Sequence, residues 1–213
     1  GLNYGRRPDA LEVDPVGLGL QHREQVLGQR LLPPAGLTLF GGIRDAAPDA
    51  WGRRVIEAKL KVPANSLPES QHLLHAGSER VGALDVRADI HTPPTPGAAA
   101  WHHLEHLMEA AGRIEEGLPV PAHLDAIFQD GTALGGARPK ASVRDEDGVL
   151  WLAKFASRSD RFDVPGVEAA CLQLAGLAGM RVPRVHTRQI GQRRVMLVQR
   201  FDRYRTDPGG PEQ

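Results

Sequence analysis

The spacing of apolar residues predicts several helices in the first half of the chain. Apolar side chains fall near helical spacing from a start at Pro48 or Asp49 to residue 60, which indicates a helix there. Similar patterns predict helices at 66–77 and 101–112, which end at Gly77 and Gly112. A third, short helix is expected at 123–131.

Two early segments are typical of strands, and one of a loop. Residues 10–20 suggest a strand broken at Pro15, and residues 80–87 alternate between apolar and polar positions. The proline-rich segment 91–100 can continue neither a helix nor a strand, so we expect a loop or linker.

The pattern changes after residue 134. Two hairpins are predicted, one with its turn at Asp147-Gly148 and one turning near Gly191-Gln192. Between them, residues 164–180 form a predicted helix, with Pro165 near its start and Gly179 near its end. The order is loop, strand, strand, helix, strand, strand, which gives an α+β fold class.

Composition narrows the function classes. Lysine plus arginine and aspartate plus glutamate balance at 26 each, so no direct nucleic-acid binding is predicted. A single cysteine, Cys171, excludes disulfide scaffolds and cysteine-based zinc sites. No apolar run reaches the length of a membrane span, and the first residues lack the apolar core of a signal peptide. We expect a soluble, cytoplasmic protein with no membrane partner.

Three features in the second half point to phosphate chemistry. A small-residue loop at 135–140 would let backbone N–H groups approach phosphate oxygens. Lys154 ends an apolar strand and could supply a point charge, which Glu168 on the next helix could hold in place. Each feature also has a purely structural reading, as a turn, a surface lysine and a helix-dipole partner. Neither GxxxxGK[ST] nor GxGxxG is present.

Other candidates have simpler structural readings. His102 and His106 lie four residues apart on one predicted helix face, but without an HExxH pattern a solvated face is favoured over a metal site. Cys171 and Trp51 are expected in the core, and Arg193-Arg194 beside a turn is expected in solvent. No metal ligand and no catalytic residue is assigned.

The stretches LGGARPKASV, LWLAKF, VEAACLQLAGLAGMRVPRV and MLVQRFDR resemble the HipA family, the serine/threonine kinase toxins of type II toxin–antitoxin modules. Three upstream stretches, ALEVDPVGLGL, FGGIRDAAPDAWGRRVIEAKL and RVGALDVR, resemble its N-terminal pattern. The resemblance implies a HipA-like N-terminal domain at 1–128 and an ATP-binding small lobe, an antiparallel sheet with one helix, at 129–213.

The resemblance also implies an ATP site. Lys154 would contact the phosphates, and Glu168 would be the helix glutamate. Adenine would be held at a hinge formed by Gln199, Arg200 and Phe201. Asp202 and Arg203 complete the motif and would order the hinge by an ion pair. The mobile phosphate loop would contribute Gly135, Gly136, Ala137, Arg138 and Lys140. The family's autophosphorylated serine would fall near Ala133, with Thr132 beside it.

The family's catalytic half is not found in these residues. Its kinases need a catalytic aspartate and magnesium-binding residues, yet the only asparagines, Asn3 and Asn65, precede Lys154. We expect the N-terminal part of a toxin kinase that binds ATP with Mg²⁺ and is inactive alone, its catalytic lobe missing. Expected partners are a DNA-binding HipB-like antitoxin and a protein substrate such as an aminoacyl-tRNA synthetase.

The alternative is a non-catalytic interaction module or a decayed kinase remnant, which docks the antitoxin or a separate kinase half. A remnant would expose an apolar patch beside Phe201, where the missing lobe would pack.

Overall fold

The computed structural model describes residues 2–3, 30–31, 39–80, 84–89, 91–93, 98–128 and 136–203. The chain folds as two compact units, Gly1–Ala47 and Pro48–Gln213. The second unit thus holds residues on both sides of position 128, and the domain boundary expected there stays a prediction. Among the described residues, no helix is both long and apolar enough to cross a membrane.

The described residues of the first unit form three short elements. Strand β1 (Leu2–Asn3) pairs antiparallel with β2 (Arg30–Leu31), and helix α1 spans Gly41–Asp45. The sequence pattern did not predict α1. The strand expected at 10–20 lies outside the described residues.

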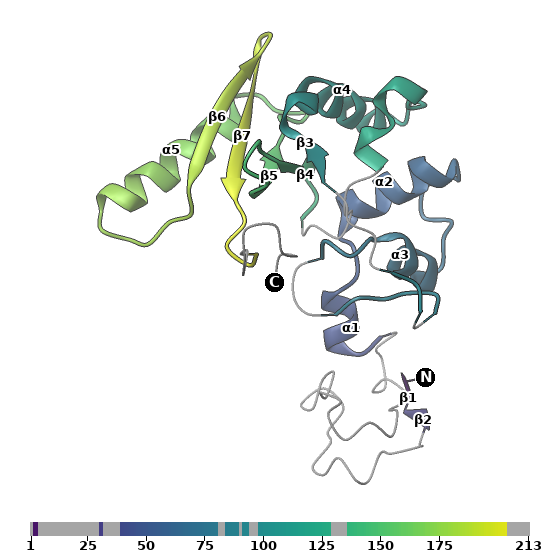
Figure 1. The fold of residues 1–213 in the computed structure, drawn as a ribbon. Helices are drawn as coiled ribbons and strands as arrows, with labels where there is room; N and C mark the ends of the chain where they lie inside the picture. Colours follow the sequence, from purple (N-terminus) through teal and green to yellow (C-terminus); the bar gives the residue numbers. More distant parts are fainter. Residues whose placement is uncertain are drawn as a thin grey trace. The chain divides into compact units, whose positions relative to one another are not determined.

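The second unit is built on a five-stranded sheet in the order β3-β4-β5-β7-β6 (Figure 1). The strands are β3 (Ala99–Ala100), β4 (Lys140–Arg144), β5 (Leu150–Lys154), β6 (Val185–Ile190) and β7 (Arg193–Gln199). Strand β3 runs parallel to β4 and the other pairs are antiparallel. Both predicted hairpins are confirmed, and Gly148 turns the first with a φ of 78°.

The helices of this unit are α2 (Ala50–Leu60), α3 (Glu69–His75), the 3₁₀ turn η2 (Trp101–His103), α4 (Leu104–Glu115), the 3₁₀ helix η3 (Ala122–Phe128) and α5 (Val164–Leu177). They confirm the helical segments expected from the pattern, and with the mixed sheet they confirm the α+β class. The end expected for the helix at 101–112 was wrong, because α4 continues past Gly112. Its apolar face extends to Ile114, which is 6% exposed.

Two further expectations were wrong. The described part of segment 80–87 is not a strand. At its start, Arg80 is buried, and its guanidinium donates to the Leu73 carbonyl at 2.6 Å. The segment expected as a loop at 91–100 ends in strand β3, which extends the sheet beside β4.

The two faces of the sheet carry different side chains. Along β5, Trp151 and Ala153 join the main apolar core with α2 and α4, whereas Leu152 and Lys154 line the cavity on the side of α5. Trp51 lies in that core as expected. The core position expected for Cys171 was wrong: it is exposed, since α5 buries only Pro165 and Ala169.

Candidate functional site

A cavity of about 380 Å³ lies between the 136–140 loop, strand β5 and the first turns of α5. Six of the nine residues predicted for the ATP site line it: Gly136, Ala137, Arg138, Lys140, Lys154 and Glu168. The remaining lining residues are Pro139, Leu152, Phe155, Val164 and Pro165. The structure therefore brings together loop, strand and helix residues that the sequence placed on separate elements.

Lys154 and Glu168 form an ion pair across the cavity wall. Lys154 is the last residue of β5, and Glu168 lies early in α5, which begins where the Asp163 side chain accepts the Gly166 N–H at 3.0 Å. Both side chains keep contact with solvent, with exposed fractions of 29% and 39%. The pair holds the amine at the cavity while leaving part of it open to a ligand.

A second amine lies beside the first. Lys140 is the Cα partner of Lys154 in the β4–β5 pairing, and only 7% of its surface is exposed. Burial, together with the positive charge of Lys154, lowers the pKa of Lys140 from 10.5 to about 8. Two lysines on adjacent strands thus concentrate positive potential at one end of the cavity.

Arg138 is tethered at the rim of the cavity. It forms an ion pair with Asp160, which also accepts the Ser157 N–H at 2.9 Å. The hydrogen bond from Arg138 lowers the pKa of Asp160 below its ordinary value and outweighs the effect of burial. Asp160 therefore has a structural partner, and its ion pair with Arg138 holds the middle of the loop.

Residues at the start of helix α2 hold both ends of the loop, although the sequence did not predict them for the site. The Asp49 carboxylate accepts the Gly136 N–H, and the Trp51 indole N–H donates to the Lys140 carbonyl at 2.8 Å. Gly136 has a φ of 100°, and a Cβ there would lie 2.9 Å from the Lys140 Nζ. The Asp49 side chain accepts no N–H of its own helix. An aspartate just before a predicted helix was therefore the only feature of the sequence near Asp49 that could have pointed to this contact.

Residues 132–210 match the family model for the HipA-like C-terminal domain. This segment of the chain is HipA-like, which confirms the resemblance of the stretches after residue 132. The resemblance of the upstream stretches to the family's N-terminal pattern stays a prediction. No curated protein matches the chain. The match contains the cavity's loop, Lys154 and Glu168, whereas α2 with Asp49 and Trp51 lies before it.

The last strand of the HipA-like segment leads away from the cavity. Gln199 and Phe201 do not line it, and Phe201 is 89% exposed. The N–H groups of Gln199 and Arg200 donate to the carbonyls of Arg184 and Leu150, at 2.9 and 3.1 Å. Gly135, Thr132 and Ala133 lie outside the described residues.

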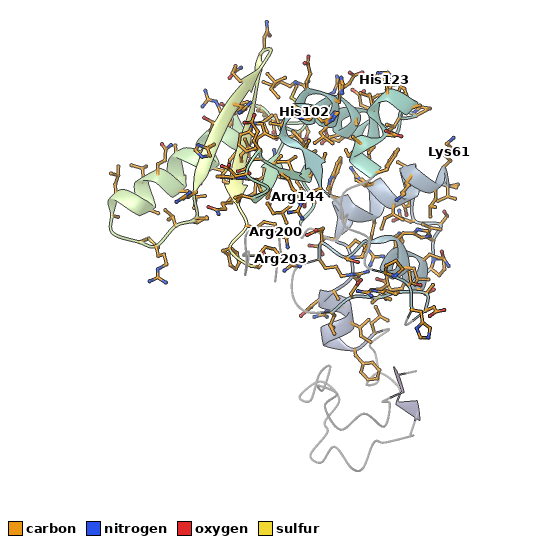
Figure 2. The ribbon with its side chains drawn as sticks, in the orientation of Figure 1. Lys61, His102, His123, Arg144, Arg200 and Arg203 are labelled. Atoms are coloured by element: carbon orange, nitrogen blue, oxygen red, sulfur yellow. The ribbon has the colours of Figure 1, made fainter. Side chains whose placement is uncertain are left out.

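Arg200 is the centre of a buried polar network in the HipA-like segment. Its guanidinium pairs with Asp202 at 2.5 Å and donates to the Glu79 carbonyl at 2.9 Å. Arg203 also contacts Asp202, at 3.2 Å, and donates to the Arg80 carbonyl. Figure 2 shows Arg200 and Arg203 close together beyond the end of β7. The motif residues therefore anchor the end of β7 to segment 79–80.

We expect Asp202→Ala to lower the free energy of unfolding by about 2–3 kcal/mol, because Arg200 would remain buried without its carboxylate. Burial tends to raise the pKa of Asp202, but its hydrogen bond to Arg200 and the charges of Arg200 and Arg203 outweigh this and lower it. The carboxylate of Asp202 therefore stabilises the fold fully at pH values above the ordinary aspartate pKa of the unfolded chain. This stabilisation is lost as the pH falls through the lower pKa that Asp202 has in the folded chain.

Urea denaturation of both proteins between pH 3 and pH 7 measures this difference. Asp125→Ala, which removes an exposed aspartate on η3, is the control. A loss for Asp202→Ala that is no larger than for the control, or that does not shrink at low pH, would show that the network does not stabilise the fold.

The other sequence candidates do not join the cavity lining. The rings of His102, His103, His106 and His123 follow one another at 4.2, 5.9 and 6.4 Å between centroids. Within the described ranges, no group of three or more histidine, cysteine, aspartate or glutamate side chains is placed to hold a metal ion. Arg194 pairs with Asp163 at 3.3 Å beside the start of α5.

Proposed function

We propose that the HipA-like segment is the ATP-binding small lobe of a serine/threonine kinase and that the cavity at Lys154 receives the phosphates of ATP. The observation that carries this proposal is the Lys154–Glu168 ion pair at a cavity edged by a glycine-containing loop. In protein kinases, a strand lysine held by a helix glutamate contacts ATP phosphates in the same way.

The electrostatics of the cavity favour an anion. Lys140 and Lys154 contribute two amines from adjacent strands, against the one carboxylate of Glu168 in the lining. Val164 and Pro165, at the start of the 14-residue helix α5, also line the cavity. The positive end of the helix dipole therefore adds to the lysine charges at the place where phosphate oxygens would lie.

Adenine would bind beyond the cavity, at the segment around Gln199 and Phe201. Because the N–H groups of Gln199 and Arg200 already donate within the fold, we propose that adenine uses the Gln199 carbonyl and the Phe201 N–H. The exposed ring of Phe201 would cover one face of the base.

We expect Lys154→Ala to weaken ATP binding about tenfold or more, because the phosphates would lose the cation that Glu168 positions. Isothermal titration calorimetry with ATP measures the affinity. Lys59→Ala is the matched control, since Lys59 lies on α2, outside the cavity lining. Equal ATP affinities for Lys154→Ala, Lys59→Ala and the unaltered chain would contradict the proposal.

The remaining functional assignments are proposals that follow from the family. The chain would take part in transfer of the ATP γ-phosphoryl group to a serine or threonine of a protein such as an aminoacyl-tRNA synthetase, in the cytoplasm, under control of a HipB-like antitoxin. Within residues 1–213, no asparagine follows Lys154. We therefore propose that the Mg²⁺-binding asparagine of the family is supplied from outside these residues.

A non-catalytic interaction module is the second candidate, favoured by the apolar surface of α5. Val167, Leu174 and Leu177 on this helix are 50%, 64% and 86% exposed, and Met180 just beyond it is 65% exposed. Such side chains suit a protein partner better than solvent. An interaction module would bind no ATP in either the unaltered or the Lys154→Ala form, so the same titration separates the two functions.

A further inference from the structure

A second cavity, of about 390 Å³, opens on the core face of the sheet, the face opposite Lys154. Trp101 follows the edge strand β3, and Arg188 lies on the other edge strand, β6. The two meet here: the Arg188 Cζ lies 4.5 Å from the centre of the Trp101 ring. The sheet therefore curls so that its two edges enclose one hollow.

The walls of this hollow are aromatic and held in place. The rings of Trp101 and Trp151 meet edge to face, with centroids 5.7 Å apart. The Trp151 indole N–H donates to the Asp145 carboxylate at 2.8 Å, and Asp145 also accepts the Val149 N–H at 2.8 Å. Because the turn and the indole fix each other, the walls are ordered before any ligand arrives.

The charges around the hollow are predominantly acidic. Asp145, Glu146 and Asp147 come from the β4–β5 turn, and Glu146 and Asp147 are exposed. Among the described residues that line the hollow, Arg188 is the one lysine or arginine. Three carboxylates against one guanidinium leave negative potential at the mouth of an aromatic cavity, which suits an organic cation.

We propose that this cavity binds the arginine side chain of a partner protein. Arg188 already makes such a cation–π contact within the chain, because its guanidinium lies over the Trp101 ring. An incoming guanidinium would compete with Arg188 for that ring, while Glu146 and Asp147 provide carboxylates for charge-assisted hydrogen bonds at the rim. This site is separate from the Lys154 cavity and does not depend on ATP binding.

The three indole N–H signals of the chain allow a direct test by ¹⁵N-correlated nuclear magnetic resonance. Trp101 and Trp151 line the proposed site, whereas Trp51 donates its indole N–H to Lys140 on the loop of the other cavity. On titration with Nα-acetyl-arginine amide, we expect the Trp101 and Trp151 signals to shift and saturate while the Trp51 signal stays in place. Nα-acetyl-citrulline amide, the neutral analogue, is the matched control ligand and should produce no saturable shift.

Two variants test the assigned roles. The double variant E146Q/D147N in the exposed turn should weaken arginine binding about fivefold or more, because the rim loses its charges. Arg188→Ala should strengthen binding, because it frees the Trp101 ring. The proposal is overturned if citrulline binds as well as arginine, if all three indoles shift alike, if E146Q/D147N binds arginine unchanged, or if Arg188→Ala abolishes binding.

Discussion

Replacing Trp51 by alanine is expected to lower the free energy of unfolding by about 3–5 kcal/mol, the range for removing a large aromatic side chain from a core. Trp51 is 2% exposed and belongs to the main apolar cluster. It also donates to the Lys140 carbonyl at 2.8 Å. The alanine variant would leave a cavity and an unpaired carbonyl where helix α2 meets the loop.

Trp51→Phe separates packing from hydrogen bonding. Phenylalanine keeps most of the apolar volume but cannot donate to Lys140, so we expect a smaller loss of about 1–2 kcal/mol. Urea denaturation followed by circular dichroism measures both variants. If Trp51→Phe cost nothing, or Trp51→Ala cost under about 1 kcal/mol, the anchoring of the loop by Trp51 would be wrong.

The elements that could be predicted from the sequence are those decided by residues close together in the chain. Asp147-Gly148 marks a turn by itself, since Gly148 adopts a positive φ at no steric cost. Asp49 before apolar residues at helical spacing marks the start of α2. Pro165 marks the first turn of α5 in the same way.

The wrong expectations arose where tertiary packing decides the outcome. Glycine costs about 1 kcal/mol within a helix relative to alanine, yet α4 continues past Gly112 because Ala111 and Ile114 are buried on the core. Helix α5 is apolar around most of its circumference, so no periodicity identified its buried face. Cys171 was therefore placed in the core, although it is exposed.

The site was predictable only in part, for the same reason. Lys154 and Glu168 lie on consecutive elements 14 residues apart, and a strand–helix arrangement brings them together. Asp49 contacts Gly136 across 87 residues, and Arg200 contacts the Glu79 carbonyl across 121. No local pattern of polar and apolar residues specifies such distant contacts. The residues that position the loop and the end of β7 thus become visible only in the fold.

Lys140→Met is expected to stabilise the free protein and at the same time to weaken ATP binding. Burial disfavours the charged amine, and a fall in its pKa from 10.5 to about 8 corresponds to about 3 kcal/mol of destabilisation at neutral pH, as an upper bound. Methionine has a similar length without the charge, so we expect a gain of about 1–3 kcal/mol. ATP would lose one of the two amines on the adjacent strands.

The pH dependence gives a second readout with a defined sign. Below pH 8, both the folded and the unfolded chain hold the Lys140 proton, and the cost of burying the charge is complete. Between about pH 8 and 10.5 the folded chain releases the proton first, so stability rises with pH in this window. The advantage of Lys140→Met over the unaltered chain should therefore shrink across the same range.

ATP binding should reverse the effect of burial on Lys140, because phosphate oxygens favour the charged amine. Near pH 8 the unaltered chain would take up protons on binding ATP, and its affinity would fall as the pH rises further. Calorimetry in two buffers of different ionisation enthalpy measures the uptake, which Lys140→Met should abolish and Lys59→Met should leave unchanged. A stabilised variant that kept full ATP affinity would show that Lys140 is a buried charge with no part in phosphate binding.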